Sequence, residues 1–420
     1  MSQSINLYNQ LAKNKLFSKS INFDLKRIKL VLKKLNHPEK KLKNVINIIG
    51  SDGKYSLLTS LRYFIEANHQ KTSAYISPSL KDIRERFWMG NNFLSYKEIK
   101  KTVKIIQKQK INLTIFEALT VIFILNAARR NNDYNLIEAG ALFAKDSTNL
   151  FNFPKLQAVV NINKQHLNFL KKKTLNEVIY QKVGFLSNFT NIYIGKQKPL
   201  VLKRIKQLLK KNGSLIKYPN SWKLIKLGNN FFYKDNKTKI KLNTKYIHSK
   251  GLLENLCQAI KIALDLKIHK KIIAKTIPKI KFEARIDYIM KGRLTKKIYR
   301  NEKLLIDGCH SETSARNLAN YLKTLKIPIY GIWAMTKNKD PDRFIKQFKG
   351  IFTKIVTIPI ENESAALSNQ QLFKIAKKNN YDSEKAKSFE KALKIITSNE
   401  KKVICCFGSL YSAGNILNKN

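Results

Sequence analysis

The stretch NVINIIGSDGKYS, residues 44–56, decides the fold that the sequence predicts. Its first six residues, 44–49, form a short run rich in β-branched side chains, and the run ends at Gly50. An amphipathic stretch follows at residues 57–67. This order predicts a strand, a loop and a helix, and the backbone N–H groups of such a loop can bind phosphate oxygens at the start of the helix.

The side chains of this loop suit the same ligand. Lys54 can reach the β- and γ-phosphates of a nucleotide, and Ser56 can bind magnesium. The strict P-loop pattern is not met, because no glycine stands five residues before Gly53 and one residue separates Lys54 from Ser56. Taken by itself, the loop is equally compatible with an ordinary turn between a strand and a helix that contains a lysine.

Strand and helix patterns alternate along the first two thirds of the chain. Apolar runs at 136–137, 158–162 and 192–194 alternate with helical patterns at 116–128 and 175–182. Alternation of this kind indicates a mostly parallel sheet covered by helices. We therefore expect an α/β fold whose first domain is a P-loop-type, mostly parallel sheet.

A second cycle of the same kind begins near Phe282. Its predicted elements are a helix at 315–325 and strands at 303–306, 327–333, 355–358 and 403–407. We expect a central ATP-binding domain at 1–281, followed by a smaller Rossmann-like α/β domain at 282–420. Residues 220–247 contain alternating short runs and turn residues, which predict a β-meander appended to the first domain.

The bulk composition fits a globular protein. The chain has 420 residues and is 43% hydrophobic, so two domains are expected. No apolar run is long enough to span a membrane, and the start lacks the apolar segment of a signal peptide, so we expect a cytoplasmic protein. The four cysteines, two of them adjacent at Cys405 and Cys406, form no disulfide framework or metal motif and are expected to be reduced.

The net charge is unusual. The chain has 81 Lys and Arg against 28 Asp and Glu, a formal charge of +53, and a sequence pI near 10.1. Taken alone, this balance favours a polyanionic partner. However, the lysines are spread along the whole chain, and asparagine and isoleucine are abundant as well, which indicates compositional drift and a solvated basic surface. We expect a monomer without a nucleic-acid or membrane partner.

Several motifs, in order, give the chain a family resemblance. The loop Gly50-Ser-Asp-Gly-Lys-Tyr-Ser56 resembles the variant phosphate loop of the Mur ligase superfamily, in particular of folylpolyglutamate and dihydrofolate synthases. Similar companion motifs stand at 77–86 (SPSLKDIRER), 114–120 (TIFEALT), 137–140 (IEAG), 146–149 (DSTN), 161–166 (NINKQH), 306–311 (IDGCHS) and 408–411 (GSLY). The resemblance covers nearly the whole chain.

The resemblance implies a metal site and catalytic residues. Glu138 and His166 match the family's metal-binding glutamate and histidine, and with Ser56 they form a plausible magnesium shell. Lys182 matches a family lysine that is often carbamylated. The implied catalytic residues are Lys54, His166 and Lys182. A solvated lysine and a surface histidine are the alternatives for the last two.

The resemblance also implies a nucleotide site. Gly50 and Gly53, with Lys54 and Ser56, would hold the phosphates of ATP. Asn255 matches an asparagine near the adenine. In the second domain, Arg285 resembles an arginine that contacts nucleotide phosphates, and Asp307 and His310 match residues that face the nucleotide from a strand end.

Some positions depart from the family pattern. Tyr55 stands where a glycine follows the loop lysine, and residues 141–145 (ALFAK) replace a glycine-rich stretch. Gln165 replaces an aspartate, and Ser311 replaces an asparagine. If the backbone at position 55 needs a positive φ, a tyrosine there is strained by about 1–2 kcal/mol.

The implied activity is that of an ATP-dependent ligase. Such an enzyme adds L-glutamate to dihydropteroate, to folate or to both, through an acyl phosphate, with ATP and Mg²⁺ as cofactors. A Mur-type ligase of another substrate is an alternative, although a phosphate loop beginning at residue 50 leaves no room for a preceding nucleotide-sugar domain. A catalytically degenerate paralogue that binds nucleic acid through its basic surface is a further alternative.

Overall fold

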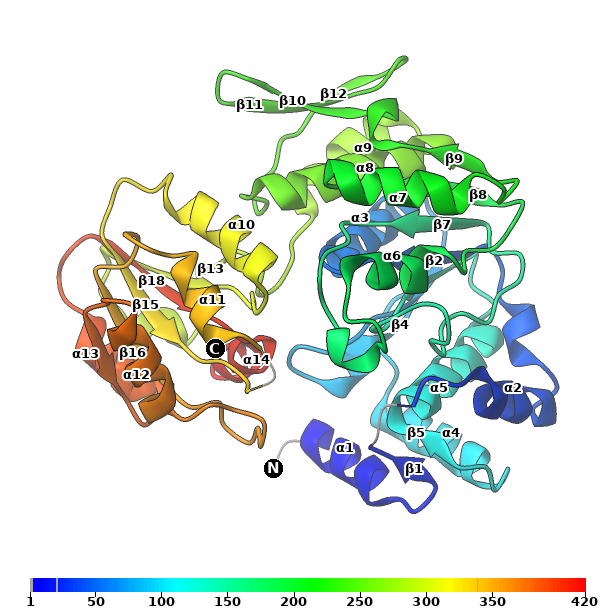
Figure 1. The fold of residues 1–420 in the computed structure, drawn as a ribbon, viewed down its shortest axis with the longest axis horizontal. Helices are drawn as coiled ribbons and strands as arrows, with labels where there is room; N and C mark the ends of the chain where they lie inside the picture. Colours follow the sequence, from blue (N-terminus) through cyan, green and yellow to red (C-terminus); the bar gives the residue numbers. More distant parts are fainter. Residues whose placement is uncertain (1–2, 20–21, 338) are drawn as a thin grey trace. The chain divides into compact units, whose positions relative to one another are not determined.

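The protein divides into two compact units. A computed structural model describes residues 3–19, 22–337 and 339–420. Unit 1 contains Met1–Lys245 and Leu252–Ile280, and unit 2 contains Tyr246–Gly251 and Lys281–Asn420. Figure 1 shows their elements in chain order, from blue to red.

A seven-stranded sheet forms the centre of unit 1. Its spatial order is β4-β3-β6-β2-β7-β8-β9, and every neighbouring pair is parallel except β3 and β4. The strands are β2 (Val45–Ile49), β3 (Thr72–Tyr75), β4 (Phe87–Met89), β6 (Tyr134–Glu138), β7 (Leu156–Val159), β8 (Asn191–Ile194) and β9 (Leu215–Lys217). Because β2, β6 and β7 are adjacent and parallel, their carboxyl ends lie at one edge of the sheet.

Helices connect these strands. In unit 1 they are α1 (Gln3–Lys13), α2 (Leu25–Lys34), α3 (Lys54–Ala67), α4 (Tyr96–Gln107), α5 (Ile115–Arg130), α6 (Leu175–Val183), α7 (Pro199–Leu209), α8 (Lys250–Asp265) and α9 (Lys270–Thr276). A capping box between Thr114 and Glu117 starts α5, whose side chains are almost all buried. Helices α6 and α7 pack their apolar faces onto buried strand residues that include Ile49, Val159 and Ile194.

Two smaller sheets complete unit 1. β1 (Phe17–Ser18) pairs in parallel with β5 (Leu113–Thr114). β10 (Lys223–Leu227), β11 (Asn230–Lys234) and β12 (Lys239–Lys241) form an antiparallel meander, green in Figure 1, beside α9. The predicted meander is therefore confirmed.

Unit 2 is built around a six-stranded sheet of order β13-β14-β18-β15-β16-β17, in which only β13 is antiparallel to its neighbour. Its strands are β13 (Asp287–Ile289), β14 (Glu302–Ile306), β15 (Ile329–Trp333), β16 (Lys354–Thr357), β17 (Ser383–Lys385) and β18 (Lys402–Phe407). Its helices are α10 (Glu312–Leu322), α11 (Pro341–Lys346), α12 (Asn369–Lys378), α13 (Phe389–Ile396) and α14 (Leu410–Leu417). Trp333, Phe344 and Phe407 stack at the centre of its core.

The structure confirms the predicted fold class of two α/β units with mostly parallel sheets. The predicted strand at 158–162 is shifted, since β7 ends at Val159, and the predicted helix at 315–325 is found as α10, which ends at Leu322. All four cysteines are free and buried, as expected. In the described part of the chain, no helix has both the length and the apolar character needed to cross a membrane.

Candidate nucleotide-binding site

The loop between β2 and α3 is shaped by two glycines. Gly50 has φ +146° and Gly53 has φ +99°, values that L side chains rarely adopt. A Cβ atom at Gly50 would clash with the side chain of Val160, and one at Gly53 would clash with the amide of Asn255. Both positions therefore require glycine, and the loop passes close to its neighbours before α3 begins at Lys54.

Tyr55 does not carry the strain that its sequence position suggested. It lies in the first turn of α3, and it is not among the described non-glycine residues with positive φ. The left-handed conformations fall on Gly50 and Gly53 instead. The expectation of a strained Tyr55 is therefore wrong, because the helix has already begun at that residue.

Lys54 and Glu138 lie together at the mouth of the loop. The Nζ atom of Lys54 is 3.7 Å from Oε1 of Glu138 and donates to the carbonyl oxygens of Gly50 and Ser51, at 3.4 and 3.3 Å. Glu138 is the buried last residue of β6, and its Oε2 accepts the N–H of Ser77 at 3.3 Å. An ammonium and a carboxylate thus meet at the carboxyl edge of the sheet.

Ser56 and Asn255 are joined by a hydrogen bond. The Nδ2 of Asn255, on α8, donates to Oγ of Ser56 at 2.9 Å, and that hydroxyl donates to the carbonyl of Gly53 at 2.9 Å. Ser56 is buried. The contact explains how α8 fixes the first turn of α3, and it brings two predicted nucleotide-site residues together.

Lys182 is buried within the same site. From α6, its Nζ donates to the carbonyl oxygens of Gly50 at 2.9 Å and Ala141 at 2.6 Å. Burial lowers the pKa of Lys182 to about 7; the positive charge of Lys54 acts in the same direction, and Asp146 and Asp52 oppose it. Near neutral pH, a large fraction of this amine is therefore uncharged.

The loop at 141–145, which departs from the family pattern, is attached to α6 by its backbone. The N–H groups of Phe143 and Ala144 both donate to the carbonyl of Gln181, at 3.1 and 2.8 Å. Ala141 contributes its carbonyl to Lys182. Because these are backbone contacts, they do not depend on the glycine-rich sequence that the family pattern has there.

His166 is the predicted residue that the described contacts join least to this group. It precedes the short 3₁₀ helix η3 (Leu167–Phe169), has φ +60°, and its ring is 6.2 Å from the ring of Phe169. Among the described residues, no three His, Cys, Asp or Glu side chains are grouped as ligands of one metal ion. That His166 shares an ion with Glu138 and Ser56 remains a prediction.

Asp52 is a site residue that the sequence reasoning missed. Its carboxylate accepts the Nδ2 of Asn163 at 2.5 Å and the Nε2 of Gln165 at 3.1 Å. The backbone N–H of Ser51 donates to the carbonyl of Asn161 at 2.8 Å. The phosphate-loop residues are thus tied to the segment after β7, and the polar run that follows that buried strand was the available signal.

In unit 2, Asp307 follows β14 directly. Its carboxylate is buried and accepts the N–H groups of Ile286 at 2.7 Å and Cys309 at 2.8 Å. Burial raises the pKa of Asp307, although the nearby Arg285 lowers it. Ala284 and Ile286 have φ +54° and +52°, so the backbone on both sides of Arg285 is strained and held by these contacts.

Arg285 and His310 lie close to the same strand end. Nη1 of Arg285 donates to the carbonyl of Ala284 at 2.9 Å, and a Cβ atom at Gly308 would approach that Nη1 to 3.0 Å. Nδ1 of His310 is 2.9 Å from the carbonyl of Gly308. The three residues predicted in this unit are therefore gathered at the carboxyl end of β14.

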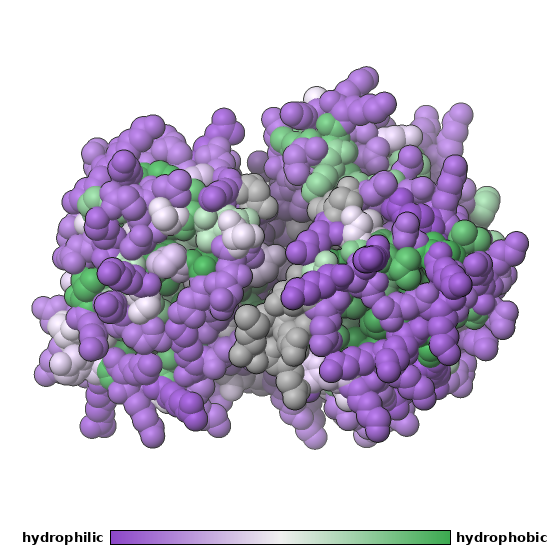
Figure 2. Space-filling model, turned by 90° about the horizontal axis from the view of Figure 1, so that it is seen from below, coloured by the Kyte–Doolittle hydropathy of each residue, from purple (hydrophilic) through white to green (hydrophobic). Residues whose placement is uncertain are grey.

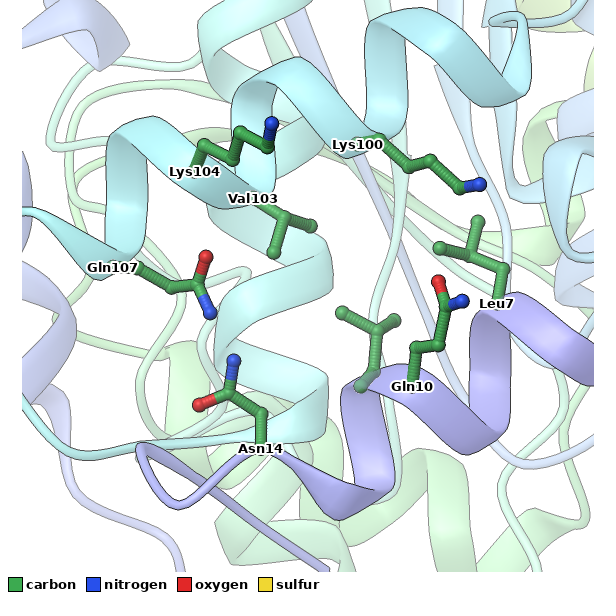
Figure 3. Close-up of a pocket in the computed structure, with 8 residues that line it drawn as sticks. Leu7, Gln10, Asn14, Lys100, Val103, Lys104 and Gln107 are labelled. Atoms are coloured by element: carbon green, nitrogen blue, oxygen red, sulfur yellow. The ribbon is translucent and has the colours of Figure 1, made fainter.

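A pocket elsewhere in unit 1 does not contain any of these residues. It lies between α1 and α4, where Leu7, Leu11 and Val103 form its floor (Figure 3). The other lining residues are Gln10, Asn14, Lys100, Lys104 and Gln107. Lys100 and Lys104 are exposed, so the pocket has no buried charged group that could fix a ligand.

Hydrophilic side chains cover most of the face shown in Figure 2, with small hydrophobic areas between them. In a chain with 81 Lys and Arg, many of these side chains are basic. The view is consistent with a solvated surface on this face. The absence of a nucleic-acid partner remains a prediction.

Taken together, the fold and the loop define an α/β protein with a phosphate-binding type of turn at the carboxyl edge of a parallel sheet. Residues 288–419 match the family model described as the dihydrofolate synthetase C-terminal domain. The chain is 23% identical to the dihydrofolate synthetase of Saccharomyces cerevisiae, over 76% of this chain and 77% of that protein. It is 21% identical to the dihydrofolate synthase/folylpolyglutamate synthase of Buchnera aphidicola, over 96% and 94% of the two chains.

A solved structure has the same fold. Folylpolyglutamate synthase of Mycobacterium tuberculosis, complexed with ADP and AMPPCP, is 16% identical and superposes with a TM-score of 0.86, covering 99% of this chain and 97% of that one. With the domain match and the relatives, the evidence is consistent along the chain. The protein belongs to the dihydrofolate synthase/folylpolyglutamate synthase family.

Proposed function

We propose that this protein is an ATP-dependent ligase that joins L-glutamate to dihydropteroate, to folate or to both. The observation that carries the proposal is the meeting of Lys54, Glu138 and Lys182 at the loop that begins at Gly50. The names of its relatives support the choice of substrates. The structures solved with adenine nucleotides support ATP as the phosphoryl donor.

The residues at the loop fit a magnesium ion. The carboxylate of Glu138 and the hydroxyl of Ser56 are oxygen donors, which magnesium prefers, and both lie at the carboxyl edge of the sheet. We propose that His166 completes this set, directly or through water. When bound, the ion would help neutralise the charge of the transferred phosphoryl group.

The first chemical step is phosphoryl transfer. A carboxylate oxygen of the pteroate or folate substrate attacks the γ-phosphorus of ATP; the new O–P bond forms as the bond to ADP breaks, giving an acyl phosphate. Lys54 and the N–H groups of the loop stabilise the charge on the phosphoryl oxygens. In the second step, the amine of glutamate attacks the acyl carbon, inorganic phosphate leaves, and the amine loses a proton.

We propose that Lys182 acts in a carbamylated form. An uncharged lysine amine can add carbon dioxide, and the lowered pKa of Lys182 provides that form near neutral pH. The product would be an anion beside Lys54. The resemblance to the family's carbamylated lysine is the second support for this role.

Unit 2 is proposed to contact the nucleotide through Arg285, Asp307 and His310. Asn255 is proposed to serve the same ligand from unit 1. The proposed domains are the ATP-binding part at 1–281 and the smaller part at 282–420. We further propose a monomeric, cytoplasmic enzyme; size-exclusion chromatography with light scattering would test the first of these, and a dimer would contradict it.

The test is a ligation assay. Purified protein would be incubated with ATP, magnesium, radiolabelled glutamate and either dihydropteroate or tetrahydrofolate. We expect ATP-dependent incorporation of label with at least one of the two acceptors. Incorporation with dihydropteroate alone defines a dihydrofolate synthase, and incorporation with tetrahydrofolate alone defines a folylpolyglutamate synthase. No incorporation with either acceptor, by a protein shown to be folded, would overturn the proposal.

A further inference from the structure

Three loops form the amino edge of the seven-stranded sheet on the side of β7, β8 and β9. They are residues 151–155, 184–190 and 210–215, and each precedes one of these strands. Because the three strands are parallel, their amino ends lie at the edge opposite to the candidate nucleotide site. Side chains on these loops can therefore be changed without touching the residues at the carboxyl edge.

The three loops are bonded to one another. Oγ1 of Thr190 donates to the carbonyl of Pro154 at 2.7 Å, and Oγ of Ser187 donates to the carbonyl of Phe151 at 3.2 Å. The N–H of Phe189 donates to the carbonyl of Asn212 at 3.4 Å. The loops thus make one connected surface rather than three separate tips.

This surface exposes large apolar side chains. Phe153 is 89% exposed, Phe189 is 82% exposed, Leu215 is 63% exposed and Phe185 is 39% exposed. We call these four residues the aromatic edge. Single exposed apolar residues are common, but several on connected loops indicate a surface that contacts another apolar phase.

The surroundings of the aromatic edge are basic. Lys155, Lys210 and Lys211 are exposed on the same loops. The sequence of the three loops contains no Asp or Glu. The surface therefore combines apolar side chains with uncompensated positive charge, and its partner must offer apolar contact and negative charge together.

We propose that the aromatic edge docks on an anionic lipid surface. Phenylalanine rings enter the boundary between headgroups and acyl chains, while lysines bind the phosphate groups of the lipids. A second copy of the chain fits poorly, because a twofold contact would place the lysines of both copies against each other. Four apolar side chains are also few for a stable protein interface, which buries about 800 Å² on each partner.

The apolar part of the proposal is tested with vesicles and the full-length protein. Vesicles of phosphatidylcholine, alone or mixed with phosphatidylglycerol, would be sedimented with the protein. We expect binding to the mixed vesicles only, and a loss of at least about tenfold in partitioning for the Phe153→Ser/Phe189→Ser variant. The control is Leu200→Ser, because Leu200 is 80% exposed on α7 but follows the carboxyl end of β8.

The charged part is tested at constant net charge. Lys155→Gln/Lys210→Gln/Lys211→Gln removes three positive charges from the aromatic edge. Replacing Lys171, Lys172 and Lys173 with glutamine removes three from the segment between β7 and α6, which lies toward the carboxyl edge. We expect the first variant to bind mixed vesicles at least about tenfold more weakly than the second.

Two results would overturn the proposal. One is a wild-type protein that does not bind the mixed vesicles. The other is binding that falls equally in edge and control variants, which would reflect the total charge of the chain. Loss of a protein partner in the aromatic-edge variants, with vesicle binding unchanged, also counts against lipid. A Phe189→Trp variant adds a direct readout, since its extra tryptophan emission should shift to the blue on the vesicles.

Discussion

The two edges of the seven-stranded sheet differ in how their side chains are held. At the carboxyl edge, Lys54, Glu138 and Lys182 are largely buried and bonded to the backbone around them. At the amino edge, Phe153 and Phe189 project into solvent. The same fold thus presents a preorganised polar site at one edge and an exposed apolar surface at the other.

This difference teaches what each edge can bind. Buried polar groups keep a fixed geometry, because leaving them without partners is costly, so they suit a small charged ligand such as a phosphate chain. Exposed rings gain free energy only when an extended apolar surface covers them. Substitutions should therefore affect turnover at the carboxyl edge and not at the amino edge.

The largest effect is expected for Lys54→Ala. Loss of the ammonium at the loop should lower kcat on the order of 10²-fold or more, which corresponds to about 3 kcal/mol of transition-state stabilisation. The control is Lys71→Ala, since Lys71 is exposed just before β3, at the amino edge. Steady-state ligation kinetics would measure both. Equal turnover of the two variants would remove the loop from the mechanism.

The next effect concerns pH and Lys182. Because its pKa is about 7 in the folded protein and 10.5 is its ordinary value, the unfolded chain binds a proton between these pH values that the folded protein does not. The free energy of unfolding should therefore rise with pH across this window, by up to about 1.4 kcal/mol per pH unit. Lys182→Met should remove that rise.

Urea unfolding from pH 7 to pH 10 in buffer free of carbon dioxide would measure the difference between wild type and Lys182→Met. Parallel pH profiles of the two proteins would show that the amine is not buried in its uncharged form. Added bicarbonate should raise ligation activity in the wild type and leave the variant unaffected, if Lys182 is carbamylated.

A smaller effect is expected for Gly53→Ala. The new Cβ would clash with the amide of Asn255 at a position with φ +99°, so the variant should lose about 2 kcal/mol or more in stability and bind ATP more weakly. Gly228→Ala is the matched control, because Gly228 has φ +55° and nothing within 4 Å of the new atom. It should lose only about 1 kcal/mol. Urea unfolding would compare them, and equal losses would contradict the close contact with Asn255.

The smallest effect is expected for Tyr55→Gly. Because Tyr55 is helical, glycine relieves no strain there and should lower stability by about 1 kcal/mol or less, with ligation activity near that of the wild type. Thermal unfolding would measure the change. A clear gain in stability would mean that the tyrosine is strained after all.

Much of the fold could be predicted from the sequence. The strand at 44–49, the helix after it and the helix at 116–128 have strong patterns, and all three are found. The strands β1, β5 and β13 were not predicted, because two or three residues are too few to show a periodicity. Their pairing depends on the surrounding tertiary structure.

The site was predicted in part. Local motifs identified Lys54, Glu138 and Lys182, and the structure brings these together. The carbonyl partners of Lys182 could not be predicted, since Gly50 is 132 residues away and backbone atoms leave no trace in a sequence. The role of Asp52 was missed for a related reason, because its amide partners lie on another loop. The exposure of Phe153 and Phe189 was equally hidden, since an apolar residue in a loop is as often buried.

The central claim is that the carboxyl edge of unit 1 binds the phosphates of ATP. Calorimetric titration of ATP at physiological salt, with magnesium and then with the metal chelated, tests it most directly. The account predicts saturable binding that requires magnesium and weakens at least about tenfold in Lys54→Ala. Absence of ATP binding by the folded wild type, or binding that Lys54→Ala leaves unchanged, would contradict it.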